Sequence, residues 1–200
     1  GTTTCVVADR WGNVVAATPS ANVFRDGSNG GRSGVTYGNR LRSLNTTPGH
    51  PNCIQVGKRP RITLTPTLVL KNGSPILAIS VAGGDLQDQA TMNLLLNFIE
   101  FQMLPEAAVT APRFATAHHQ DSFDPNPNRT QAFKQVGSLT ISDSIDLSVQ
   151  QELAMRGHQL EVKSSPIANP VMLYIDQESG TLYAAGDPEA GRHAAGLGEK

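Results

Sequence analysis

The chain opens on residues that can perform acyl chemistry: Gly1 is followed by Thr2, Thr3 and Thr4, which lead directly into an apolar segment. A threonine at a chain start is a self-contained nucleophile, because its hydroxyl attacks while its own α-amine accepts the proton. The pKa of such an amine is about 7.7–8.0, near neutral pH, whereas that of a lysine is about 10.4. This chemistry requires cleavage of the Gly1–Thr2 bond. On these four residues alone, the start of a strand rich in β-branched residues is the simpler interpretation.

A pair of glycines forms the second chemical feature. Gly83 and Gly84 follow an apolar run and precede a long helical pattern. Two glycines allow backbone N–H groups to converge on an anion near a helix N-terminus, as an oxyanion hole requires. A tight strand-to-helix turn with positive φ explains the same pair equally well.

The elements that must position these residues follow from apolar periodicity and turn signals. Asn72-Gly73 between two apolar runs predicts a β-hairpin. The helix over 88–103 is apolar nearly all round, which predicts burial between a sheet and another layer. The remaining expected elements are strands over 5–9, 14–17, 67–70, 76–81, 159–163, 171–176 and 181–185, helices from Pro105 and over 146–156, and long irregular segments over 25–34, 45–60 and 115–138. Strands and helices come in runs, so we expect one α+β domain over 1–200, with antiparallel sheets and helices on a face.

Composition excludes several classes of protein. A net charge of −1 provides no basic surface for nucleic acid. No apolar run approaches the roughly 18 residues of a membrane span. The two cysteines, Cys5 and Cys53, fit neither a disulfide framework nor a zinc site, and we expect Cys5 to be buried on its strand. Charged residues make up only 16% of the chain, against about 25% in a typical domain, so we expect another chain to cover part of the surface.

Taken together, a series of short motifs resembles the small, C-terminal subunit of the gamma-glutamyltransferase (gamma-glutamyltranspeptidase) family. The resemblance spans nearly the whole chain and includes Thr2-Thr3, VADRWGN at 7–13, PGHPN at 48–52, GKRP at 57–60, TPT at 65–67, NG at 72–73, GGDLQ at 83–87, NFIEF at 97–101, APRF at 111–114, GH at 157–158 and GDP at 186–188. It implies an N-terminal-nucleophile hydrolase with a four-layer αββα sandwich, made as a precursor that cuts itself before the nucleophilic threonine. The partner would be the larger upstream subunit, in a heterodimer or higher oligomer, and no cofactor or metal is implied.

The resemblance also implies residue roles. Catalytic positions fall on Thr2, Thr3, Ser20, Gly83 and Gly84. Substrate-binding positions fall on Asn22, Arg40, Ser43, Thr63 and Asp85. Thr2 would be the nucleophile, Ser20 would hydrogen-bond its amine or oxygen, and the two glycines would form the oxyanion hole. Judged from local sequence alone, Ser20 and Asn22 also suit an Asx or Ser turn.

The chain departs from the family pattern in the substrate headgroup region. Ser43 stands where the transpeptidases carry the acid that binds the α-ammonium, and Arg40 stands where they carry an uncharged amide. Ile62-Thr63 replaces a pair of serines. Loss of a carboxylate and gain of a guanidinium favour an anionic acyl group. We therefore expect an acyltransferase or amide hydrolase that forms an acyl-threonine intermediate on a small amide or peptide, with a gamma-glutamyl or related acyl group.

Two other interpretations stay open. If Gly1 remains joined to Thr2, the amine is part of a peptide bond, and the chain is an unprocessed, non-catalytic homologue with a binding or structural role. The second is a metal site on His118-His119 with Asp121 or Asp124. Adjacent histidines on an extended loop point apart, so the pattern argues against this site.

Overall fold

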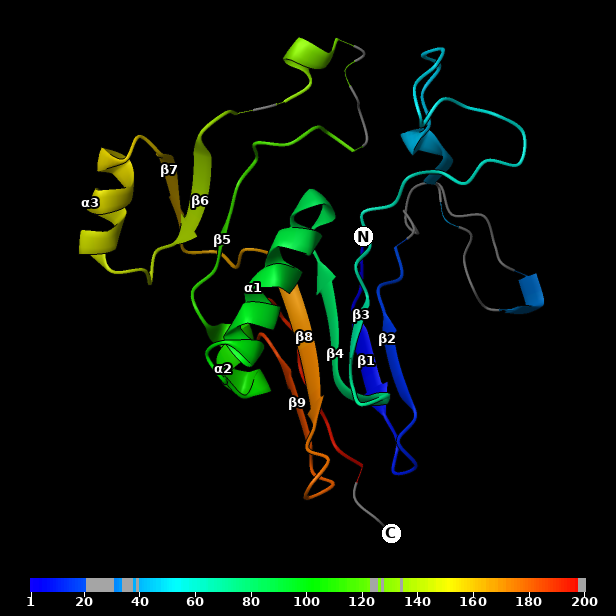
Figure 1. Ribbon diagram of the computed structural model, residues 1–200, viewed down its shortest axis with the longest axis vertical. Coiled ribbons are helices and arrows are strands. Elements are labelled where there is room, and N and C mark those ends of the chain that lie inside the picture. Colours follow the sequence, from blue (N-terminus) through cyan, green and yellow to red (C-terminus); the bar gives the residue numbers. More distant parts are fainter. Residues whose placement is uncertain are drawn as a thin grey trace.

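The computed structural model describes residues 1–20, 31–33, 38, 40–122, 126, 128–133 and 135–197 (Figure 1). Within this part of the chain, a four-stranded antiparallel sheet has the order β3–β4–β8–β9, a hairpin pairs β1 with β2, and a three-stranded sheet has the order β5–β6–β7. The strands are β1 (Cys5–Ala8), β2 (Val14–Ala17), β3 (Thr67–Lys71), β4 (Ser74–Ala82), β5 (Phe114–Ala115), β6 (Ser138–Ser142), β7 (Gln159–Lys163), β8 (Asn169–Ile175) and β9 (Leu182–Gly186). The helices are α1 (Gln87–Ile99), α2 (Pro105–Thr110) and α3 (Leu147–Met155), with 3₁₀ turns at Gly31–Ser33, Arg40–Ser43, Gly84–Leu86 and Arg129–Gln131.

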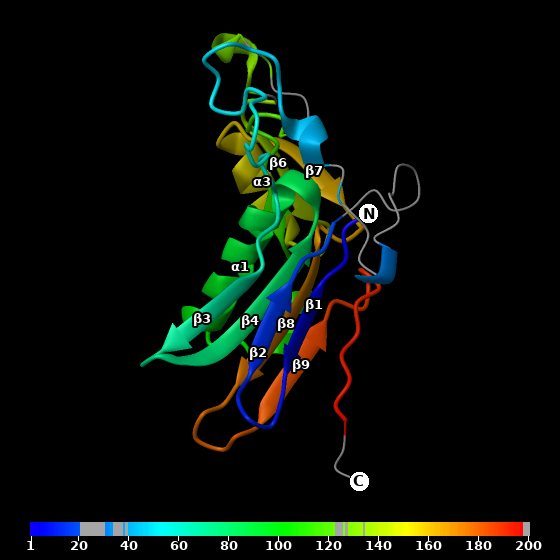
Figure 2. The same cartoon turned by 90° about the vertical axis from the view of Figure 1, so that its right-hand side faces the viewer.

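The four-stranded sheet is the middle layer of the molecule. Helices α1 and α2 pack on one face, and the β1–β2 hairpin packs on the other (Figure 2). The β5–β6–β7 sheet and α3 form a separate lobe beside them (Figure 1). The α+β class expected from the order of the elements is therefore correct. None of the described helices is long and apolar enough to cross a membrane.

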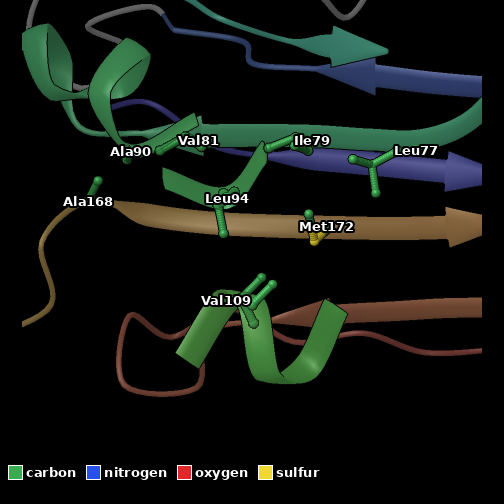
Figure 3. Close-up of a cluster of buried hydrophobic side chains, with 9 residues drawn as sticks. Leu77, Ile79, Val81, Ala90, Leu94, Val109, Ala168 and Met172 are labelled. Carbon is green, nitrogen blue, oxygen red and sulfur yellow. The ribbon is translucent and has the colours of Figure 1, made fainter. Parts of the chain in front are cut away.

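Strand β4 is buried on both faces, and its residues divide by size. Leu77, Ile79 and Val81 are 0% exposed and belong to the core cluster under α1 (Figure 3). The alternate residues, which face the hairpin, are the small Ala78, Ser80 and Ala82. Since successive side chains of a strand point to opposite faces, this alternation presents bulk to the helices and lets the hairpin approach closely.

Helix α1 differs from its prediction at its end and on its outer face. It stops at Ile99 rather than Met103, because Glu100 caps the helix and Gln102 takes a left-handed φ of 54°. Its inner face is buried, with Leu94 at 0% exposure, whereas Met92 and Ile99 are 57% and 54% exposed. The expected burial on all sides is wrong for the described chain, which covers only the inner face.

The segment expected to be irregular over 115–138 is so in its described residues, apart from the 3₁₀ turn Arg129–Gln131 and single residues at the end of β5 and the start of β6. Two further expectations needed correction. Cys5 is exposed rather than buried, at the first position of β1, where exposed and half-buried residues alternate. Helix α3 starts at Leu147, since the Asp146 carboxylate caps it by accepting from the Ser148 amide at 2.8 Å.

Candidate active site

The start of the chain lies beside the end of the β1–β2 hairpin. Thr2 and Ser20 form an antiparallel bridge, and the Thr3 amide donates to the Pro19 carbonyl at 3.0 Å. This pairing brings the Thr2 Oγ1 and Ser20 Oγ atoms to 2.9 Å. Two of the residues expected to be catalytic therefore share a hydrogen bond, whereas Thr3 is exposed.

Arg40 completes a chain of polar groups at this point. It begins the 3₁₀ turn Arg40–Ser43, and its Nη2 donates to Ser20 Oγ at 2.8 Å. Burial lowers the pKa of the Arg40 guanidinium, Arg42 adds to the decrease, and Asp85 opposes it. The group stays charged at neutral pH, because an arginine guanidinium does not lose its proton in proteins. The Ser20 oxygen accepts from the guanidinium, and its own proton stays available to donate to Thr2 Oγ1, so Arg40 polarises the hydroxyl beside the Thr2 oxygen.

A buried hydroxyl pair anchors the site to the core. Thr18 Oγ1 lies 2.7 Å from Ser80 Oγ, which also donates to the Ala17 carbonyl at 2.8 Å. Thr18 is 5% exposed and Ser80 is 0% exposed. Sequence reasoning missed this anchor, although a lone serine inside the apolar run of β4 was a usable signal.

The two glycines lie between β4 and α1. Gly83 has a φ of 164° and a ψ of 15°, and Gly84 takes the left-handed φ of 62° that favours glycine. The Leu86 amide donates to the Gly83 carbonyl at 3.2 Å, which closes the turn. We call residues 83–86 the glycine turn. A Cβ placed on Gly83 would lie 3.0 Å from the Ala168 Cβ, so a side chain at this position would require one of the two residues to shift.

A polar pocket of about 200 Å³ opens beside the glycine turn. Its lining residues are Arg61, Ile62, Thr63, Leu64, Thr65, Gly84, Asp85, Asp88, Gln89, His119 and Gln120. The structure thus places Thr63 and Asp85 together with Gly84, as expected. Within the described part of the chain, the buried Thr63 Oγ1 has no hydrogen-bond partner. The fully buried Gln87, with its amide nitrogen facing two carbonyls, donates to Val81 O and Thr63 O at 3.0 Å each and fixes this wall.

The other expected site residues are placed differently. Ser43 is 1% exposed, and its hydroxyl lies 2.7 Å from Arg40 O and 2.9 Å from Arg61 O. The Ser43 hydroxyl therefore links the 3₁₀ turn at Arg40 to the backbone at Arg61. Asn22 lies outside the described residues.

The histidine pair does not form a metal site with the residues that can be described. No group of three or more histidine, cysteine or acidic side chains in the described chain has a geometry that would hold a metal ion. His119 Nδ1 is instead 3.9 Å from Asp85 Oδ2 and 2.9 Å from the Gln120 carbonyl. Asp124 lies outside the described residues.

A second and much larger groove runs along β1. It has a volume of about 1560 Å³ and is lined by residues 4–11, by parts of β8 and β9, and by residues 193–197. Its walls include the apolar side chains of Val6 from β1 and of Val171 and Leu173 from β8. Strand β1 pairs with β2 on one side only within the described chain, so its other edge borders this groove.

Comparison with known proteins gives a consistent result. The family model described as Gamma-glutamyltranspeptidase matches residues 1–197. The Glutathione hydrolase proenzyme of Bacillus subtilis (strain 168) is 30% identical over 200 residues, covering 100% of this chain and 31% of that protein. The Acylase ACY 1 proenzyme of Pseudomonas sp. (strain V22) is 28% identical over 185 residues, covering 92% of this chain and 30% of the relative. The chain thus spans about three-tenths of the length of these curated relatives.

The solved structures agree with the fold. A crystal structure of acivicin-inhibited gamma-glutamyltranspeptidase superposes with a TM-score of 0.70 and 27% identity, over 94% of this chain and 98% of that chain. The expected N-terminal-nucleophile hydrolase fold is therefore confirmed, and the matched chain has the size of a small subunit. The match over nearly all residues and the shared fold show that this chain belongs to the gamma-glutamyltranspeptidase family.

Proposed function

We propose that this chain is the catalytic part of an amide hydrolase or acyltransferase in which Thr2 is the nucleophile. The observation that supports this most directly is the 2.9 Å contact between Thr2 Oγ1 and Ser20 Oγ, with Arg40 donating to the same serine. A cationic donor behind the hydroxyl pair favours negative charge on the attacking oxygen. Membership of a family of glutathione hydrolases and acylases adds independent support.

The proposed reaction has two covalent steps and begins after the Gly1–Thr2 bond has been cleaved. The Thr2 hydroxyl attacks the amide carbonyl, and its proton passes to the freed Thr2 amine. The backbone N–H groups of Gly83 and Gly84 stabilise the tetrahedral oxyanion. Collapse of this intermediate breaks the C–N bond, the amine leaves with the proton, and an acyl-threonine ester remains. Water or an acceptor amine then attacks the ester and regenerates the hydroxyl.

We propose that a larger subunit of the same precursor covers the exposed apolar surface. Two surfaces support this partner: the outer face of α1, with Met92 and Ile99, and the groove along the edge of β1 that pairs with no other described strand. An unpaired strand edge beside an apolar groove is suited to pairing with a further strand. The relatives carry the word proenzyme in their names and are about three times as long as the matched region.

We propose that the substrate's acyl group carries a negative charge at the end away from the scissile amide. Arg40 supplies a permanent positive charge, and Ser43 provides no carboxylate to bind an ammonium. An acyl group with a carboxylate and no α-amine suits this pair, and an acylase among the relatives is in keeping with this choice.

The processing claim is tested by the intact mass and N-terminal sequence of the protein expressed with its natural upstream segment. We expect a small subunit that begins at Thr2. Thr2→Ala should leave the precursor uncleaved, and Thr2→Ser, which keeps a hydroxyl, should restore cleavage at a lower rate. A wild-type precursor that never cleaves would contradict the nucleophile assignment and leave a non-catalytic role.

Substrate choice is tested with a matched pair of anilides. The glutaryl anilide carries the terminal carboxylate without the α-amine, and the γ-glutamyl anilide carries both. We expect the glutaryl compound to have the higher kcat/KM, and Arg40→Gln to narrow the difference. A clear preference for the γ-glutamyl compound would refute the anionic headgroup proposal and leave the amide-cleaving mechanism intact.

A further inference from the structure

Three polar side chains recur at intervals of four residues through the glycine turn and the first half of α1. They are Asp85 in the glycine turn and Gln89 and Asn93 in the helix. Residues at this spacing share one face of a helix. All three hold the segment 114–122, which runs back along the helix toward the pocket.

The two helical positions bind the backbone of that segment. Asn93 Nδ2 donates to the Phe114 carbonyl at 3.3 Å. Gln89 makes a two-way contact with Thr116, because its Nε2 donates to the carbonyl at 2.9 Å and its Oε1 accepts from the amide at 2.8 Å. The Gln89 side-chain amide thus bonds the Thr116 backbone as a neighbouring strand would, through one donor and one acceptor. Together with the Asn93 bond, this contact holds the segment alongside the helix.

Asp85 binds the far end of the same segment. Its Oδ2 accepts from the Ser122 amide at 3.1 Å, and its Oδ1 accepts from the Ser122 hydroxyl. Ser122 is 3% exposed, so the contact is protected from water. His119, from the same segment, approaches the carboxylate at 3.9 Å. The carboxylate is thus occupied by the protein itself.

We propose that Asp85 is a positioning residue, which ties the glycine turn to segment 114–122 and so fixes the direction of the Gly84 N–H group. This inference rests on the proposed function for its catalytic consequence. It replaces the expectation that Asp85 binds substrate. Asp85 follows Gly84 directly, and glycine adopts φ values of either sign readily, so the contacts of the neighbouring Asp85 help to select the observed φ of 62°.

The hydrogen bonds of Asp85, Gln89 and Asn93 to segment 114–122, which we call the ladder, also shape the pocket. His119 and Gln120 belong to the held segment and line the pocket together with Gly84 and Thr63. Release of the Ser122 contact would therefore loosen the pocket wall and the oxyanion donor at once. A misplacement of about 1 Å at a reacting group costs roughly 100-fold in rate.

The test compares Asp85→Ala with Asp85→Asn in the processed, full-length protein. An asparagine keeps both contacts, since its amide oxygen accepts from the Ser122 N–H and its amide nitrogen donates to the Ser122 hydroxyl. We expect Asp85→Ala to lower kcat by about 10- to 100-fold with little change in KM. Asp85→Asn should recover most of that loss. Ser122→Ala, which removes only the hydroxyl, should lie between them.

Hydrogen exchange supplies a readout that does not depend on activity. Exchange of the Ser122 amide should accelerate by about tenfold or more in Asp85→Ala and stay slow in Asp85→Asn. Asp88→Ala is the matched control, because it removes a carboxylate near the same helix start that bonds the Gln89 amide, and it should leave Ser122 exchange unchanged.

Each result decides the proposal. If KM rises equally in Asp85→Ala and Asp85→Asn while Ser122 exchange stays slow, the carboxylate binds substrate and the positioning role is wrong. If Ser122 exchange responds as expected but kcat does not change, the ladder is structural only, which also overturns it. If the wild-type protein cleaves no anilide, the proposed function fails, and Ser122 exchange still shows whether Asp85 holds the segment.

Discussion

The most informative perturbation is a single methyl group on the glycine turn. Gly83 has a φ of 164° and a ψ of 15°, outside the left-handed region, so the effect of a methyl group at this position is judged from its contacts. An added Cβ would lie 3.0 Å from the Ala168 Cβ and 3.4 Å from its Cα. Ala168 has no rotamer that would relieve this contact. The backbone of one partner must therefore move in Gly83→Ala.

The cost follows from the shortfall in distance. Carbon atoms pack best at about 3.5–4.0 Å, so the two methyl groups would be roughly 0.5–1 Å too close. Overpacking of this kind destabilises a protein by about 1–3 kcal/mol. If the Gly83 N–H also stabilises the oxyanion, its displacement lowers kcat toward the roughly 10²–10³-fold loss that follows removal of one such donor.

Gly84→Ala is the matched comparison, because its cost has a different origin. No atom lies within 4 Å of the Gly84 Cβ position, but φ there is +62°. The expected loss is about 1–2 kcal/mol, from the left-handed backbone alone. A substitution at position 168 should not relieve it.

Ala168→Gly removes the opposing methyl group. Ala168 has a φ of 62°, so glycine is well suited to this position. We expect Ala168→Gly to recover about 1 kcal/mol or more of the Gly83→Ala loss, as a coupling energy in a double-mutant cycle. Urea unfolding of the four proteins measures this, and kcat measured in parallel reports the oxyanion donor. Losses that add within about 0.5 kcal/mol would refute the steric account.

Two further predictions concern the framework. Arg113 and Asp187 form a buried ion pair, with side chains 6% and 4% exposed. Asp187→Asn or Arg113→Met should each lower the free energy of unfolding in urea by about 3–5 kcal/mol, because one charge is left buried without its partner. Replacement of both residues by apolar ones should lower it by less than either single change. A loss from the joint replacement equal to the sum of the single losses would contradict this. The Asp146 carboxylate at the start of α3 has a pKa below its ordinary value of 3.8, mainly because the Ser148 hydroxyl donates to it. Its contribution to stability is therefore complete above that value and is lost as the pH falls through the lower folded-state pKa. Asp146→Asn keeps the cap and should remove this part of the acid dependence, measured as unfolding free energy from about pH 5 to about pH 2; an unchanged acid dependence in Asp146→Asn would contradict the assignment.

Local signals in the sequence were sufficient for most elements of the fold. Asn72-Gly73 marks the turn between β3 and β4, and both residues have positive φ. The end of α1 was less predictable, because the left-handed residue after it is Gln102 rather than a glycine. The outer face of α1 was misjudged for a different reason. Apolar periodicity reports what a helix can bury, and it does not say whether the covering layer lies in the same chain.

The site was only partly accessible to sequence reasoning. The family motifs pointed to Thr2 and Ser20, and the structure places their hydroxyls in contact. The contact from Arg40 could not be derived, because 20 residues separate it from Ser20 and no periodic pattern fixes where the intervening chain returns. The ladder did leave a local signal: polar residues at 85 and 89 recur at helical spacing beside an apolar stripe. Their partner segment follows no such pattern.

The position of one half of the site relative to the other depends on the division of residue sizes along β4. The nucleophile lies beside the hairpin, and the glycine turn follows β4 directly, so their separation depends on how closely the hairpin approaches that strand. Small residues on one face of β4 permit a close approach, and Ser80 fixes it by bonding to Thr18 and to the Ala17 carbonyl. The large residues on the other face hold the strand against α1, which directly follows the glycine turn that carries Asp85. Packing in one strand therefore sets the positions of the attacking oxygen and of the N–H groups that would receive the oxyanion, although these groups lie about 80 residues apart in the sequence.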